Sequence, residues 1–181
     1  MTDTALDFAA AFIARSRHYL HTEYPTKLRA AVKAMPADAL WWRANATSNS
    51  VGNLLLHLEG NVRQWLVGGV GGVDVTRDRA GEFSATSGAN ADSLLAHLEH
   101  TLDDVDAVLA RLTAADLASR RSIQGRDVTV FEAIYHVVEH FSLHLGQIIL
   151  VAKLHAPGAV QFYEDAGGRA RPLWPEMVNK R

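Results

Sequence analysis

Apolar residues recur at three- and four-residue spacing through four long segments of this chain, and that spacing is typical of amphipathic α-helices. The expected helices run from about residue 4 to 34, from 48–50 to 67, from 91 to 112 and from 129–130 to 154. Pro25 is expected to kink or split the first helix, and Pro36 ends it. Long helices joined in this way predict an all-α chain that folds as an antiparallel four-helix bundle.

The segments between and after the helices carry weaker patterns. Residues 73–90 are predicted to form a loop, and residues 120–130 to form a short β-like hairpin that turns at Gly125. Residues 155–181 show no clear periodicity and are predicted to be an irregular C-terminal tail. Because no repeat or low-complexity tract divides the sequence, we expect a single domain over residues 1–181.

Two residue counts limit the chemistry of the chain, which has no cysteine and nine histidines. Without cysteine, the chain can form no disulfide, no thiolate nucleophile and no cysteine-ligated metal site. A metal ion would therefore be bound by imidazole and carboxylate groups. The histidines make such a site plausible by number alone.

Charge and hydropathy exclude other classes of protein. Eighteen basic residues against twenty acidic ones give a net charge of -2, and no basic cluster of the kind that binds nucleic acid is present. The first seven residues lack the basic and apolar regions of a secretory signal, and the apolar runs are too short to span a bilayer. We therefore expect a cytoplasmic protein with neither a nucleic-acid nor a membrane partner.

A stripe of uncharged polar residues follows one side of the second predicted helix. At about 100° per residue, its members all lie within about 40° of His57; they are Ser50, Asn53, Asn61 and Gln64. The charged residues Glu59 and Arg63 lie elsewhere and account for the solvent face. A polar stripe that borders the core is expected to line an internal pocket.

The last predicted helix repeats this pattern with His136, His140, His144 and Gln147 on one side. Histidines four residues apart can share one metal ion, whereas the outer two of three stand about 12 Å apart along the axis. One pair together with His57 would bind a metal and leave a coordination position open. The spacing leaves the choice of pair open, and such a pair also occurs on solvated helices without a metal.

The remaining histidines are predicted to lie outside any site, because charged neighbours or a helix end explain them. They are His18, His21, His97, His100 and His155. Arg77 and Arg79 in the predicted loop are candidates to contact an acidic cosubstrate, although loop arginines are usually only solvated.

Two passages of the sequence resemble motifs of the DinB/YfiT-like superfamily. Residues 135–148, YHVVEHFSLHLGQI, resemble its last-helix motif, and residues 53–61, NLLLHLEGN, resemble its second-helix motif. The resemblance extends over residues 4–154 and implies an up-down-down-up four-helix bundle, often dimeric. It also implies a divalent metal, zinc or nickel, bound by His57, His140 and His144. His136, Asn53, Asn61, Gln64 and Gln147 would then line the site or support the ligands.

The resemblance implies a function as well. Characterised relatives include transferases that use low-molecular-weight thiols, and a metal with an open position stabilises a thiolate at neutral pH. The thiol would be a cosubstrate, because the chain has no cysteine. Relatives that are thiol-dependent isomerases have glutamate where this chain has His140, so that activity is not implied. The alternatives are a metal- or small-ligand-binding or stress-associated protein without catalysis, and a purely structural polar stripe.

Overall fold

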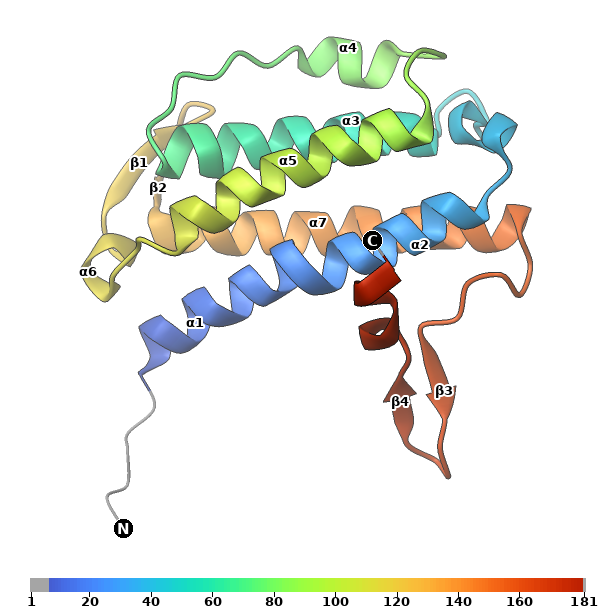
Figure 1. Ribbon diagram of the computed structural model, residues 1–181. Coiled ribbons are helices and arrows are strands. Elements are labelled where there is room, and N and C mark those ends of the chain that lie inside the picture. The colour runs from blue at the N-terminus through green and yellow to red at the C-terminus, as the bar shows by residue number, and fades with distance from the viewer. Residues whose placement is uncertain (1–6, 181) are drawn as a thin grey trace.

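The computed structural model describes residues 7–180, and within them the regular secondary structure is helical apart from two short hairpins (Figure 1). The first helical run comprises α1 (Phe8–Arg17), a π-helical segment (His18–Glu23) and α2 (Tyr24–Ala34). The second comprises α3 (Val51–Val62) and a π-helical segment (Arg63–Val70), and the third is α5 (Ala91–Leu109). The fourth is α7 (Val130–His155). The predicted helical start near Thr4 lies outside the described residues.

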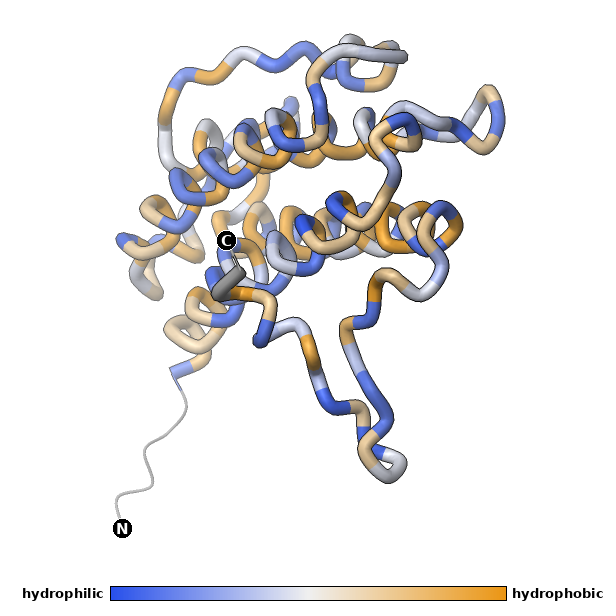
Figure 2. The backbone as a smooth tube through the Cα atoms, turned by 45° about the vertical axis from the view of Figure 1, so that its right-hand side comes forward, coloured by the Kyte–Doolittle hydropathy of each residue, from blue (hydrophilic) through white to orange (hydrophobic). Residues whose placement is uncertain are grey.

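The long helices form two layers (Figure 1). α3 packs along α5 in one layer, α2 packs along α7 in the other, and α3 also contacts α7. The first run and α7 point in one direction, and α3 and α5 point in the opposite one. Apolar residues recur along each helix (Figure 2) and meet in a core that includes Leu58, Leu98, Val137 and Phe141, each fully buried. The predicted periodicity therefore identified the all-α class.

Pro25 lies where the first run changes its hydrogen-bond pattern. The π-helical segment ends at Glu23, and Pro25 is in the first turn of α2, where its missing N–H leaves little unsatisfied. The helix is thus interrupted locally, as predicted, but not ended.

Shorter elements connect the long helices. The predicted hairpin is present as β1 (Arg120–Ile123) and β2 (Arg126–Thr129), which pair antiparallel with Ile123 opposite Arg126. Its turn contains Gln124 and Gly125, both with positive φ. Three short helices also lie between the long ones: a 3₁₀ segment (Ala37–Trp41), α4 (Arg79–Ser84) and α6 (Ala114–Leu117).

Two segments predicted to be irregular contain regular structure. Residues 73–90 include α4, which begins where the Asp78 carboxylate accepts a hydrogen bond from the Gly81 backbone N–H. The C-terminal tail forms β3 (Tyr163–Asp165), β4 (Ala170–Pro172) and a 3₁₀ segment (Trp174–Lys180). The Lys27 ammonium holds this tail, because it lies over the Trp174 ring and donates to the Tyr163 hydroxyl. Contacts this distant in sequence leave no local periodicity.

α7 is the one described helix that is long and apolar enough to cross a membrane by length and composition alone. Core helices of soluble proteins satisfy the same criterion, so this is weak evidence for a membrane span. Only 28% of its most apolar window is buried, however. α7 therefore carries more apolar surface than the described chain covers.

Candidate metal centre

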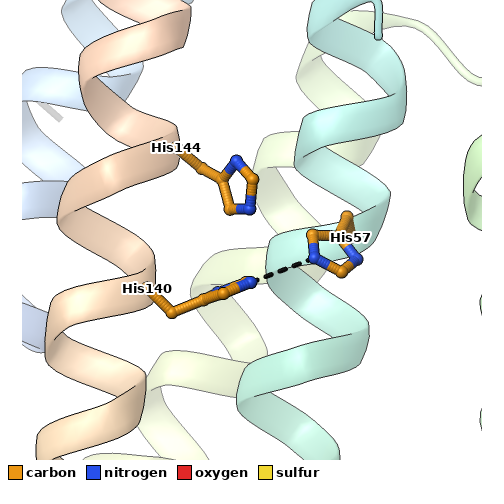
Figure 3. Close-up of side chains that lie close together, drawn as sticks. All are labelled: His57, His140 and His144. Atoms are coloured by element: carbon orange, nitrogen blue, oxygen red, sulfur yellow. Dashed lines mark hydrogen bonds between the residues drawn. The ribbon is translucent and has the colours of Figure 1, made fainter.

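Three imidazole rings converge between α3 and α7 (Figure 3). His57 comes from α3, and His140 and His144 come from successive turns of α7. One ring nitrogen from each histidine lies within 4.8 Å of those of the other two. The closest pair is His57 Nε2 and His140 Nε2, which are 3.0 Å apart. The structure thus brings together the three residues predicted as ligands.

Capping at the helix starts helps fix the register of the ligands. At α3, the Ser50 hydroxyl accepts from the Asn53 N–H while the Asn53 side chain accepts from the Ser50 N–H. Thr129 and Glu132 form the same reciprocal capping box at the start of α7. Beside the rings, Phe141 buries the core side of α7 and leaves His140 and His144 on the side that faces α3.

Glu82 of α4 contacts the His57 ring at Nδ1, the ring nitrogen that faces away from His140 and His144. Its Oε2 lies 2.9 Å from His57 Nδ1. An ionised carboxylate can only accept, so Nδ1 carries the proton and donates it to this hydrogen bond. The Nε2 lone pair of a neutral His57 is therefore free and directed toward His140. A carboxylate that orients a histidine in this way is common around metal ions.

Arg77 completes this support as a buried partner of Glu82. Its Nε donates to Glu82 Oε1 at 2.6 Å, and its Nη2 donates to Glu82 Oε2 at 2.7 Å. Both side chains are almost fully buried, at 6% and 8% exposed. Burial alone would raise the pKa of Glu82, but the hydrogen bonds from Arg77 and His57 outweigh it and lower the pKa. Glu82 is consequently a carboxylate at neutral pH.

His144 and His140 are also suited to bind a metal ion as neutral imidazoles. His144 Nδ1 lies 2.7 Å from Gln147 Oε1, which can only accept, so Nδ1 carries the proton and Nε2 is left as the ligand atom. Burial lowers the pKa of His140 to about 3, and the neighbouring His144 and His57 rings add to this effect. Burial likewise lowers the pKa of His144. Neutral imidazole is the form that binds metal ions.

The donor set fits a divalent transition metal. Two nitrogens bound at about 2.1 Å to one ion stand roughly 3.0–3.4 Å apart for angles between about 90° and 109°, and the His57–His140 separation is 3.0 Å. The buried His140 Nδ1 has no hydrogen-bond partner among the described residues, so no protein group fixes the tautomer of that ring, and its Nε2, which faces His57, is free to be the unprotonated nitrogen. Three nitrogens suit zinc, nickel and copper better than calcium or magnesium.

The residues predicted to line the site have different positions. His136 stacks on Trp65 with ring centroids 4.2 Å apart, and its Nε2 is 3.4 Å from the Asn61 amide nitrogen. Gln64 Oε1 accepts from Arg77 and from Gln124 at the tip of the β1–β2 hairpin. Gln64 therefore supports the ligands indirectly, through Arg77 and Glu82.

Asn53 has a role that differs from the predicted one. Its amide oxygen accepts from Ser50 and Arg43, and its amide nitrogen donates to the backbone carbonyls of Glu82 and Ala85. These bonds satisfy the amide completely and direct it away from the imidazoles. Asn53 fastens the α4 segment to α3.

Sequence reasoning missed the role of Glu82 and misjudged that of Arg77. Arg77 was a candidate for an acidic cosubstrate, but its guanidinium is paired with Glu82; Arg79 lies over the Phe83 ring. One signal was present in the sequence, the glycine at position 60 inside α3. A Cβ there would collide with the Glu82 carboxylate and Arg77 guanidinium. A glycine inside a helix indicates such a close approach.

The histidines predicted to lie outside the site do so in the described structure. His97 and His100 are exposed on α5. His18 and His21 lie beside Glu23 and Asp103, respectively, and His155 packs edge-on against Trp42.

A surface cavity of about 610 Å³ lies along α7, and of the three histidines His140 is in its wall. It is lined by Tyr24, Tyr135, His136, Val138, Glu139, His140, Ser142 and Leu143. Since His140 belongs to both, a small molecule in this cavity would lie beside the imidazole cluster.

Comparison with protein families gives one match. Residues 7–161 match the model of a family described as a protein of unknown function, DUF1572. The matched range includes the three histidines, Arg77 and Glu82, and it ends before the β3–β4 hairpin. No curated protein matches the chain.

Proposed function

Since this chain belongs to the DUF1572 family, whose members are of unknown function, we propose a function from the site itself. The chain binds one divalent metal ion through His57, His140 and His144. The observation that carries this proposal is the convergence of three ring nitrogens within 4.8 Å. Glu82 and Gln147 support it, because they fix the proton of His57 and His144 on the nitrogen that faces away from the others.

We further propose that the metal centre is catalytic. Three protein ligands leave at least one position open, and a bound metal would there act as a Lewis acid that favours the anionic form of water or of a thiol. The chain itself contributes orientation: Glu82 and Arg77 hold His57, and His136 stands at the wall of the neighbouring cavity. That cavity would admit a small-molecule substrate.

The substrate class comes from the resemblance to the DinB/YfiT-like superfamily, which is part of this proposal. The order and directions of the four helical runs support an up-down-down-up bundle of that type. We propose a transferase that activates an external low-molecular-weight thiol on zinc or nickel. The absence of cysteine agrees with a thiol that is supplied as cosubstrate.

Metal analysis of the purified protein tests the first part of the proposal. We expect near-stoichiometric zinc or nickel, lost in His57→Ala and in His144→Ala. His97→Ala is the matched control, because His97 is an exposed histidine on α5. Wild-type protein that binds neither metal in a titration, or His57→Ala that binds as wild type does, would refute the site.

Turnover of an electrophile such as monochlorobimane with several bacterial thiols tests the second part. We expect metal-dependent product formation that the metal-free protein lacks. Metal that raises the melting temperature without turnover of any thiol would instead assign the chain to the non-catalytic metal-binding class.

A further inference from the structure

Arg79, the first residue of α4, lies close to the imidazole cluster. Its guanidinium is over the Phe83 ring, 5.0 Å from the ring centroid. The two residues are four apart and therefore share one face of the helix. The Phe83 ring in turn packs against the His57 ring, with the centroids 4.6 Å apart. One aromatic ring therefore separates the Arg79 guanidinium from a proposed metal ligand.

Phe83 is held in this position by hydrogen bonds that do not involve Arg79. The Phe83 backbone carbonyl accepts from Arg43 Nη2 at 2.9 Å. Two residues further on, the Ala85 carbonyl accepts from both Arg43 and Asn53. These bonds fasten the C-terminal end of α4 to the rest of the chain. Substitution of Arg79 is therefore expected to leave α4 and the imidazole cluster in place.

The Arg79 charge is not neutralised by a carboxylate among residues 7–180. Arg79 is exposed and forms no ion pair there. The nearest acidic residues in sequence have other partners, since Asp78 accepts from the Gly81 N–H and Glu82 pairs with Arg77. An exposed arginine is usually only solvated, but this guanidinium rests on an aromatic ring. A guanidinium on a ring face keeps its hydrogen-bonding edges available to an anion.

The charges around the three ligands would not balance a divalent cation. The ligands bind a metal as neutral imidazoles and bring no negative charge to it. Glu82 is offset by Arg77 in the same buried pair. Glu139 lines the neighbouring cavity, but it is exposed and its charge is screened by water. A bound metal would therefore keep most of its positive charge, and Arg79 adds a second positive charge nearby.

We propose that Arg79 selects an acidic cosubstrate, one that carries a carboxylate a few bonds away from the thiol directed at the metal. The guanidinium would bind this carboxylate through two parallel hydrogen bonds, and the linking atoms would pass over the Phe83 ring. Arg79 is then a specificity-determining residue that distinguishes acidic from neutral thiols. The inference rests on the proposed function for the thiol end of the cosubstrate, whereas the carboxylate end depends on Arg79 alone.

Binding of two matched thiols to the zinc-loaded full chain tests this inference without turnover. Mercaptopropionate and mercaptoethanol are both small thiols, but only the first has a carboxylate. In isothermal titration calorimetry, wild type should bind mercaptopropionate about fivefold or more tightly than mercaptoethanol. Arg79→Gln should lose this preference while its affinity for mercaptoethanol and its zinc content stay unchanged. Arg79→Lys should keep part of the preference, because an ammonium keeps the charge but not the planar fork.

Arg169→Gln is the matched control for the change in net charge. Arg169 is also exposed and without an ion pair in the described structure, but it belongs to the β3–β4 hairpin, which projects from the bundle (Figure 1). We expect it to retain the preference of wild type. Comparison of variants, rather than of the two thiols alone, removes the intrinsic difference in acidity between the thiols.

The possible failures are distinguishable. If Arg79→Gln keeps the wild-type ratio of the two affinities, or if Arg169→Gln loses it equally, the role of Arg79 is refuted and the metal site stands. Zinc-loaded wild type that binds neither thiol would refute the thiol part of the proposed function, and with it this inference. Absence of zinc binding, measured by elemental analysis on the same samples, would refute the metal site as well.

Discussion

Replacement of Glu82 by alanine should destabilise the metal-free protein much more than the loss of an exposed ion pair. Glu82 accepts three hydrogen bonds, two from Arg77 and one from His57, in surroundings where it is 8% exposed. Its removal leaves the Arg77 guanidinium buried without its counter-charge. Breaking a buried pair in this way costs about 3–5 kcal/mol.

The comparison variant is Asp127→Ala, which removes the partner of Arg120. That pair is 59% and 68% exposed, and exposed pairs contribute about 0–1 kcal/mol. For a domain of this size, 1 kcal/mol corresponds to roughly 2–4 °C in melting temperature. Glu82→Ala should therefore melt at least about 6 °C below wild type, whereas Asp127→Ala should shift by no more than a few degrees.

The assay is urea and thermal unfolding in the presence of a chelator, followed by circular dichroism. A double-mutant cycle with Arg77→Met isolates the pair: Arg77→Met with Glu82→Gln should cost less than the sum of the single variants. If Glu82→Ala lowers the free energy of unfolding no more than Asp127→Ala does, or if the cycle shows no coupling, the reasoning about the buried Glu82–Arg77 pair is wrong.

Three further outcomes follow from the same structure. The pKa of His140 in the folded protein is lowered to about 3, so the unfolded chain takes up a proton on this residue at a higher pH than the folded chain does. The metal-free protein should therefore lose stability as the pH falls from 6.5 toward 3, by at most about 1.4 kcal/mol per pH unit and by less than that because the ring is half-exposed. His140→Gln should flatten this slope in pH-dependent urea titrations. His136→Ala should retain bound metal in elemental analysis while His140→Ala loses it, and the reverse pattern would disprove the ligand assignment. Phe141→Ala should cost about 3–5 kcal/mol in denaturant unfolding, since Phe141 is fully buried, and a cost below 1 kcal/mol would contradict its place in the core.

The long helices and the ligand triad were accessible from the sequence because both depend on local geometry. The periodicity that buries Val137 and Phe141 also turns His140 and His144 to one side of α7. Pairing that side with His57 required only that the polar stripes of two helices face each other.

The support of His57 by Glu82 and Arg77 could not be predicted from the sequence in the same way. Glu82 is 25 residues from His57 and belongs to a six-residue helix within a glycine- and serine-containing segment. No periodicity extends over so short an element. The position of Glu82 is determined by hydrogen bonds to groups that are distant in the sequence. Gly60 was the one residue whose type indicated that another segment lies close to α3. The β3–β4 hairpin escaped prediction for a similar reason, since its strands have three residues each.

Asn53 has a consequence for how the protein opens. Its amide caps α3 and at the same time binds the carbonyls of Glu82 and Ala85, so the first turn of α3 and the α4 segment share one set of hydrogen bonds. Segments joined in this way unfold together. Although residues 79–85 form a short, peripheral element, their amide hydrogens should exchange with those at the start of α3 as a single cooperative unit. The groups that orient His57 would then be lost or kept together.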